Sequence, residues 1–414
     1  MCRAFALIVL VTAVVSSSAA YAQSSQQQPS SQQQSSSSEQ QTGLATSVTA
    51  DSQDRPGFIK RMRDWAERHQ IAERLSGDVD GWYPRLGGMT RGSGFSVGPG
   101  YRFHASGVLV DLSGAYSTKA YKAVDAKVRW LQAYDDRLEV WTHYRFEDFP
   151  QEDYFGPGLA SLRDMRTSYD FDSHEIAATG LFKATPWLRV GTTIGFMNPD
   201  IGPGTDNRFP SIEALFTEQD APGLTAQPDF LHTTFFADVD YRDEPGNPRQ
   251  GGLYHAAFAV WDDRNLQQFD FRRFDLNLLQ FFPLTTDKRH VISGRLGLAY
   301  VNNDAGQHVP FYFLPYVGGV DTIRSFHEFR FKDENAVWVS AEYRWVPMKY
   351  VSFATFIDAG KVSADYQDIN ASGLKKGYGF GVRVHTRRQT FARIDFATGG
   401  GEGWKIFLKL GPKL

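Results

Sequence analysis

The chain has 414 residues, and its 44 basic and 47 acidic side chains leave a formal net charge of −3. A charge so close to balance excludes nucleic-acid binding that is driven by net charge. Cys2 is the only cysteine, so no disulfide can form within the chain, and stability must come from a large ordered structure.

Residues 1–22 are typical of a secretory signal peptide. A short start with one basic residue, Met1–Arg3, precedes an apolar run from Ala4 to Val15, and small residues stand at Ala20 and Ala22. We expect cleavage after Ala22. Cleavage there would export the protein and leave a mature chain without cysteine.

The next two segments are a linker and a helix. Residues 23–54 are rich in glutamine and serine and are expected to be a flexible linker. Residues 55–78 are predicted to form an amphipathic helix, because apolar side chains between Phe58 and Leu75 follow the helical period. Three positions for this helix stay open: packed on the main domain, on a membrane surface, or, if the main domain is a barrel, in the barrel lumen as a plug or lid.

Residues 79–414 alternate between apolar and polar side chains with a period of two, which is typical of β-strands. Between Val337 and Trp345, for example, one face is apolar and aromatic, and the other carries Ser340, Glu342 and Arg344. The segments run to about ten residues, with aromatic side chains near their ends, as in outer-membrane barrel strands. No stretch after residue 22 is apolar over the about 18 residues of a helical membrane span. We therefore predict an all-β transmembrane barrel in the bacterial outer membrane, with a soluble β-sandwich as the less favoured alternative.

Sixteen segments fit this pattern, and an even number is typical of single-chain bacterial barrels. The predicted antiparallel strands are 82–90, 92–104, 108–118, 121–132, 137–148, 166–184, 187–198, 229–243, 253–263, 270–283, 290–302, 336–346, 350–362, 375–386, 389–398 and 404–410. If the first strand starts in the periplasm, every second connection is short. The long connections 149–165, 199–228 and 303–335 then all lie on the outer side.

Three motifs stand out in the last hundred residues. The sixth long-side loop carries an isoleucine-arginine-serine-phenylalanine sequence, Ile323–Phe326, shortly after the paired glycines Gly318 and Gly319. The sequences FIDAGKV, Phe356–Val362, and GYGFGVRV, Gly377–Val384, follow on predicted strands. In this order the motifs resemble those of the BamA-like superfamily of sixteen-stranded outer-membrane insertases and translocators, also called the bacterial surface antigen family. Earlier segments extend the resemblance to about 150–410: Glu152–Ser161 and Asp240–Phe258.

The resemblance implies a site inside the barrel. In the family, the sixth loop folds back into the lumen, and its arginine meets carboxylates on the two following strands. Here that arginine is Arg324, and Glu342 and Asp358 are its candidate partners. The alternation independently places both carboxylates on the lumen face, and a guanidinium group can bind a carboxylate through two parallel hydrogen bonds. The implied site residues are Ile323, Arg324, Ser325 and Phe326 in the loop, Glu342 and Asp358 as partners, and Phe356, Asp358, Gly360, Gly379, Gly381 and Arg383 in the strand motifs.

The sequence departs from the family in three places. Ser325 stands where the loop motif has glycine, so a position that required a positive φ would be strained. The linker and single helix before residue 79 are too short for a POTRA domain, the periplasmic module of client-folding members, so a member lacking POTRA domains is expected. The chain ends in Gly411–Leu414, whereas the family usually ends on an aromatic residue.

No set of residues indicates catalysis or a bound cofactor. His174 and His327 each begin a His-Glu pair but lack the second histidine of a zinc-binding helix. Acidic loop residues such as Asp200 and Asp206 could hold calcium, but solvated loop charge is the favoured interpretation. The other predicted lumen charges are typical of any hydrated barrel interior: Arg145, Glu147, Asp238, Asp240, Arg242, Arg383, Arg393 and Asp395.

The sequence therefore predicts a function without enzymatic chemistry, metal or cofactor. The resemblance implies insertion or translocation of proteins or lipids at the outer membrane. The expected partners are outer-membrane lipid and client outer-membrane or secreted proteins, and not nucleic acid. The alternative is a passive outer-membrane pore for small solutes that kept the fold and lost protein handling.

Overall fold

The computed structural model describes residues 79–410, apart from 88, 90–91 and 134–136. The predicted signal peptide, linker and amphipathic helix lie outside the described residues, as does the C-terminal sequence Gly411–Leu414. Within the described part of the chain, no helix is long and apolar enough to cross a membrane.

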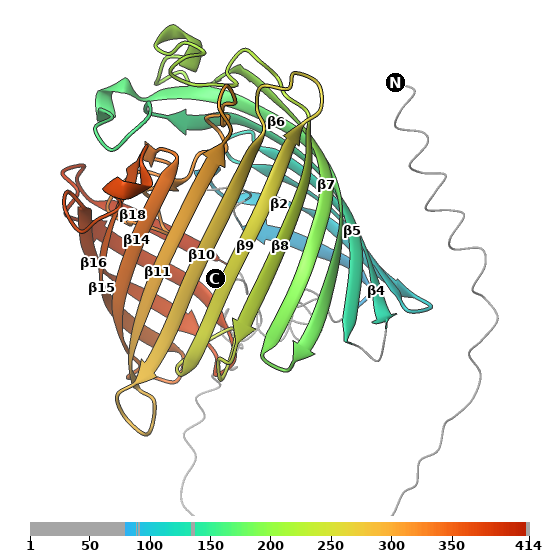
Figure 1. Cartoon of the computed structure of the whole chain (residues 1–414). Coiled ribbons are helices and arrows are strands. Elements are labelled where there is room, and N and C mark those ends of the chain that lie inside the picture. Colours follow the sequence, from blue (N-terminus) through green and yellow to red (C-terminus); the bar gives the residue numbers. More distant parts are fainter. Residues whose placement is uncertain (1–78, 88, 90–91, 134–136, 411–414) are drawn as a thin grey trace, which may run out of the picture. The chain divides into compact units, whose positions relative to one another are not determined.

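Sixteen strands form a single antiparallel sheet that curves into a barrel, with the strands slanted around its wall (Figure 1). The first eight are β1 (Gly81–Gly87), β2 (Ser96–Ala105), β3 (Val108–Ser117), β4 (Lys122–Ala133), β5 (Leu138–Tyr154), β6 (Thr167–Thr185), β7 (Leu188–Pro203) and β8 (Phe230–Asp240). The other eight are β9 (Gly251–Asp263), β10 (Phe271–Pro283), β11 (His290–Asn303), β14 (Asn335–Trp345), β15 (Val351–Ser363), β16 (Lys375–His385), β17 (Thr390–Thr398) and β18 (Lys405–Leu410).

The long loops contain short secondary-structure elements. A separate two-stranded sheet, β12 (Tyr316–Val317) and β13 (Phe331–Lys332), lies within the loop between β11 and β14. Three single-turn 3₁₀ helices lie in other loops: η1 (Arg163–Met165), η2 (Ile212–Ala214) and η3 (Tyr366–Asp368).

The structure confirms the predicted sixteen strands and their sequential antiparallel order. It differs most at β5, which was expected to end at residue 148 and continues to Tyr154. Pro150 lies at an irregularity where the register with β6 shifts between Phe149 and Glu152. Proline is tolerated at such a bulge because no ladder hydrogen bond is needed from its nitrogen, so the strand continues past it.

The alternation sorts side chains between the two faces of the sheet. On β15, Ile357 is 55% exposed on the outside, whereas its neighbour Asp358 is 1% exposed on the inside. On β16, Tyr378 and Phe380 are likewise exposed, and Arg383 is buried on the lumen face. An apolar outer surface around a charged interior is the reverse of a soluble sandwich. This arrangement excludes the β-sandwich alternative.

The first and last strands meet at a seam that differs from the rest of the wall. Every other neighbouring pair in the sheet is joined by a hydrogen-bonded ladder, from β1–β2 through to β17–β18. Among the described residues, no ladder joins β1 to β18. The barrel is therefore nearly closed, and its seam joins two of the shortest strands, of 7 and 6 residues.

The long loops gather at one end of the barrel (Figure 1). Apolar side chains of these loops and of the strand ends form a core there. Strand ends contribute Tyr154, Phe230 and Phe271, and the loops contribute Phe216 and Phe311. The rings pack edge to face, as at Tyr154 and Phe311, whose centroids lie 5.0 Å apart. This core lies at the long-loop end of the barrel.

Candidate functional site

The loop between β11 and β14, residues 304–334, folds into the barrel. Its two arms are held together by the β12–β13 sheet, in which Val317 pairs with Phe331. Gly318 and Gly319 follow β12 with φ values of 121° and 95°, a region that favours glycine. A Cβ atom on Gly318 would collide with the backbone oxygen of His327. The two glycines thus let the loop turn sharply into its tip.

All four tip residues are buried. Ile323 and Phe326 pack into an apolar cluster with Val317 and Phe331 of the loop and with the barrel wall. Arg324 lies between these two apolar side chains and is 3% exposed. Burial of a guanidinium group requires charged partners, because an unpaired charge is costly to remove from water.

Arg324 binds the inner wall through several contacts. Its Nε and Nη2 atoms donate to the two carboxylate oxygens of Asp358 at 2.8 and 2.7 Å, and its backbone nitrogen donates to the same side chain at 3.1 Å. Nη1 donates to Glu342 at 3.1 Å, and Nη2 also donates to Ser340 at 3.0 Å. The Phe356 ring lies beneath the guanidinium, with its centroid 3.3 Å from Cζ. The structure therefore brings the predicted arginine together with both predicted carboxylates and with Phe356.

The electrostatics of this contact favour a permanently charged arginine. Burial alone would lower the pKa of the Arg324 guanidinium. The hydrogen bonds and charge of Asp358, together with Glu342 and Asp395, instead raise its pKa above the usual value. The loop tip is therefore fixed by a charge that persists at any physiological pH.

Asp395 is a member of the site that the sequence analysis left among the general lumen charges. Its side chain is fully buried and lies 3.5 Å from Arg324 Nη1. It also pairs with Arg393 at 2.5 Å and lies 3.6 Å from Arg383. The alternation in β17 places Arg393 and Asp395 in the lumen. The curvature of the barrel brings them to the loop tip. The alternation of side chains along a strand does not predict that curvature.

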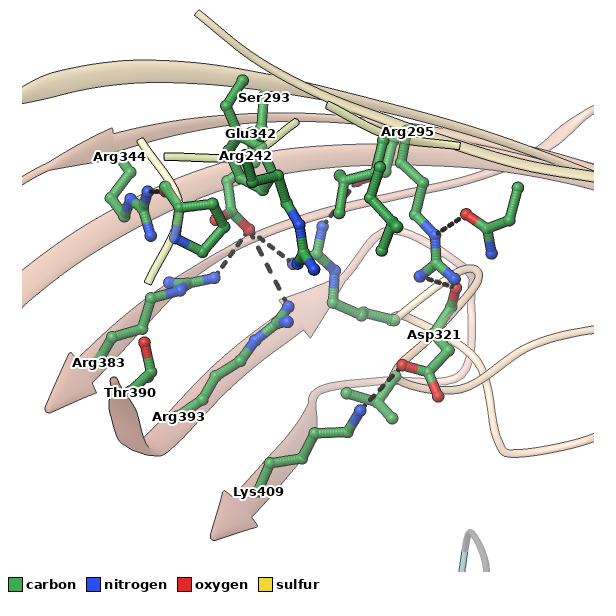
Figure 2. A pocket seen from close by; sticks show the side chains of 18 of the residues that line it. Arg242, Ser293, Arg295, Asp321, Glu342, Arg344, Arg383, Thr390, Arg393 and Lys409 are labelled. Atoms are coloured by element: carbon green, nitrogen blue, oxygen red, sulfur yellow. Dashed lines mark hydrogen bonds and ion pairs between the residues drawn. The ribbon is translucent and has the colours of Figure 1, made fainter. Parts of the chain in front are cut away.

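Glu342 is shared by three arginines. It accepts a hydrogen bond from Arg383 at 2.8 Å, in addition to that from Arg324 at 3.1 Å, and lies 4.0 Å from Arg393 (Figure 2). Arg383, predicted as part of a strand motif and as a lumen charge, is therefore part of the charged network around the loop tip.

The strand-motif glycines make room for the tip and its partners. A Cβ atom on Gly381 would overlap the Asp395 carboxylate, and one on Gly379 would lie 2.6 Å from the Phe356 ring. On Gly360 a Cβ atom would lie 2.6 Å from the backbone oxygen of Val337, on the neighbouring strand. Side chains at Gly379 and Gly381 would therefore displace Phe356 and Asp395, which contact Arg324.

Ser325 adopts a different geometry from the expected glycine-like one. Its φ is not among the positive values of the described residues, so no left-handed strain arises. The Ser325 hydroxyl lies 3.4 Å from the backbone oxygen of Lys376, and a Cβ atom on Gly377 would collide with it. Gly377 thus provides the space that Ser325 needs.

Further contacts attach the loop to the seam strand and its hairpin. Lys409 of β18 pairs with Asp321 at 2.9 Å, and Lys405 of β18 lies 2.8 Å from His327 Nε2. Arg330 pairs with Glu402, in the turn before β18, at 2.6 Å. No periodic signal predicts these pairs, because they join an irregular loop to β18 and the turn before it, more than 70 residues away along the chain.

In the described part of the chain, one cluster of acidic side chains is arranged closely enough to hold a metal ion. Asp148, Asp170 and Asp172 each place a carboxylate oxygen within 4.8 Å of the others. Such acidic groups are common without an ion. His174 contacts Tyr144, and His327 contacts Lys405.

The structure is thus a sixteen-stranded, nearly closed β-barrel with an inward-folded loop that is held by a buried arginine. Residues 223–403 match the Omp85 superfamily domain. This match confirms the resemblance seen in the sequence.

Three solved structures are similar to this chain, and the first of them shows the same fold. BamA from Haemophilus ducreyi lacking POTRA domains 1–3 is 16% identical, with a TM-score of 0.62 over 81% of this chain and 70% of that chain. CdiB from Acinetobacter baumannii is 11% identical, with a TM-score of 0.46 over 80% of this chain and 58% of that one. CdiB from Escherichia coli is 13% identical, with a TM-score of 0.48 over 79% of this chain and 59% of that one. This chain thus spans less than two thirds of the length of each CdiB chain. No curated protein matches the sequence.

Proposed function

We propose that this protein acts in the bacterial outer membrane, in the insertion or translocation of proteins or lipids, without an enzymatic step or cofactor. The Omp85 superfamily domain and the apolar outer surface of the barrel support the location. Outer-membrane lipid and client outer-membrane or secreted proteins are its proposed partners.

The observation that carries this proposal is the seam. The described parts of β1 and β18 are not joined by a ladder, whereas the other neighbouring strands are. Opening a barrel elsewhere would break a full row of backbone hydrogen bonds in a medium that offers no replacements. Opening at the seam avoids that cost. A seam that opens sideways would give a client strand or a lipid a path between the lumen and the membrane.

Cross-linking across the seam tests the proposal. Cysteine pairs joining Trp82 or Leu86 of β1 to Ile406 or Leu408 of β18 should lock the seam when oxidised. We expect the locked protein to lose assistance of client-barrel folding or passenger secretion, and a reductant to restore it. A matched control joins Ala256 to Leu276, which lie opposite each other on the paired strands β9 and β10. Full activity of the locked seam would contradict the proposal.

The passive pore is the alternative, and conductance distinguishes it. The aromatic core at the long-loop end lies where a solute path would leave the barrel, which disfavours an open channel. Planar-bilayer recordings should therefore show little steady conductance. Large stable conductance combined with no effect on client folding would favour the pore.

A further inference from the structure

The barrel contains a cavity of about 460 Å³ beneath the tip of loop 304–334 (Figure 2). The loop contributes Arg324 and Asp321, and the turn between β8 and β9 contributes Pro245 and Pro248. The remaining wall comes from the lumen faces of strands β9–β11 and β14–β18. Its volume lies in the range of small-molecule sites, about 300 to 1,000 Å³.

The cavity carries more positive than negative charge. Seven arginine and lysine side chains line it, against three carboxylates. Two more carboxylates pair with lining arginines from outside the lining: Asp240 with Arg242, and Asp395 with Arg393. Counting these, five carboxylates face seven cations, so an excess of two positive charges remains.

The excess is concentrated at buried arginines. Arg344 is 8% exposed and donates to neutral oxygens, the side chain of Asn247 at 3.3 Å and the backbone of Pro248. Within the described residues it has no carboxylate within 4.0 Å. Two carboxylates, Glu342 and Asp395, are shared among the arginines described above, Arg324, Arg383 and Arg393. The protein therefore holds more guanidinium groups around this cavity than there are carboxylates to pair with them.

We propose that this cavity binds a phosphate group. A phosphate carries the one to two negative charges that the wall lacks, and its oxygens match the forked donors of arginine. Burial strengthens such contacts because water competes for them less. The group can belong to inorganic phosphate or to the headgroup of an anionic phospholipid, and both present the same oxygens. This inference goes beyond the proposed function and holds whether the barrel moves proteins, lipids or nothing.

Binding to the purified full chain in an uncharged detergent tests the proposal. Titration calorimetry would use inorganic phosphate in one arm and dihexanoylphosphatidylglycerol, below its micellar concentration, in the other, each against chloride at equal ionic strength. We expect saturable binding in at least one arm. Binding of the lipid alone assigns a headgroup, binding of inorganic phosphate alone assigns the free ion, and binding of both assigns the shared group.

Matched variants locate the site. Arg393→Gln should weaken binding about tenfold or more, the typical effect of losing one charge-assisted hydrogen bond. Lys409→Gln provides a second test if the first variant misfolds, because its side chain is 31% exposed. Arg145→Gln, a lumen arginine outside the cavity lining, should bind as the unmodified protein does. Absence of saturable binding in both arms, or equal affinity in all variants, would overturn the proposal.

Discussion

At the scale of single residues, the contact between Arg324 and Asp358 fixes the position of the whole loop tip. Both side chains are almost fully removed from solvent, at 4% and 0% exposure. Water therefore cannot replace either partner. The consequences of removing each partner differ, because Arg324 keeps Glu342 and Asp395 if Asp358 loses its charge.

Arg324→Ala should be the more damaging change. It leaves the buried Asp358 carboxylate without a counter-charge, a loss that typically costs about 3 to 5 kcal/mol. Asp358→Asn should cost less, about 1 to 3 kcal/mol, because Arg324 retains two carboxylates. The free energy of unfolding in detergent, together with protease cleavage in loop 304–334, measures both effects. The double variant should cost less than the sum of the two, and strict additivity would mean that the pair does not interact.

Gly377 and Ser325 form a second pair at this scale. Gly377→Ala should destabilise the loop tip by about 1 to 3 kcal/mol, because its Cβ atom would collide with the Ser325 side chain. Ser325→Gly in the same chain should recover most of that loss. Thermal unfolding of the two single variants and the double variant measures the coupling. A double variant no more stable than Gly377→Ala would show that Ser325 does not fill this space.

At the scale of elements, the alternation of side chains predicted nearly every strand, since each wall strand has an apolar outer face and a polar lumen face. The same signal could not find β12 and β13, because strands of two residues show no period. It identified Glu342 and Asp358 as lumen residues, and the family resemblance joined them to Arg324. The role of Asp395 depends on the approach of β17 to the loop, which is a property of the closed barrel and not of any one segment.

The junction between loop 304–334 and β18 should depend on pH through His327. Burial, together with the nearby cations Lys405, Arg166, Arg163 and Arg330, lowers its pKa to about 3. Because the unfolded histidine binds its proton near pH 6.5, the folded state loses stability relative to the unfolded state as pH falls below about 6.5.

As the pH falls from 6.5 to 4, protease cleavage of loop 304–334 should therefore increase less in His327→Gln than in the unmodified protein. The measurement is the rate of protease cleavage in loop 304–334, compared between the variant and the unmodified protein at each pH. All other titratable groups are the same in both proteins, so only the difference between the two profiles reports on His327. Identical profiles would show that protonation of His327 is not coupled to the loop.

At the scale of the whole molecule, the parity of the strands sets which loops lie outside. The long loops and the short turns occupy opposite ends of the barrel (Figure 1). If the chain crosses the outer membrane as proposed, the loop after β7 faces the medium and the turn after β10 faces the periplasm. The burial of individual positions decides where a label can test this orientation. Ala221 and Asn247 are 0% and 2% exposed, so a label would not reach either position from any side.

Thr205 and Asp287 are suitable positions, because both are exposed and they lie at opposite ends. Cys2 lies in the predicted signal peptide, so a cysteine placed at either position is expected to be the only one in the mature chain. A membrane-impermeant thiol reagent should label Thr205→Cys on intact cells, and Asp287→Cys only after the outer membrane is permeabilised. Ala221→Cys is the matched control, since it shares the outer loop with Thr205 and should react only after denaturation. Labelling of Asp287→Cys on intact cells would show that the orientation is the reverse of the proposed one. The seam would remain, but the loop tip would then enter the lumen from the periplasm, and the proposed path for client proteins would fail.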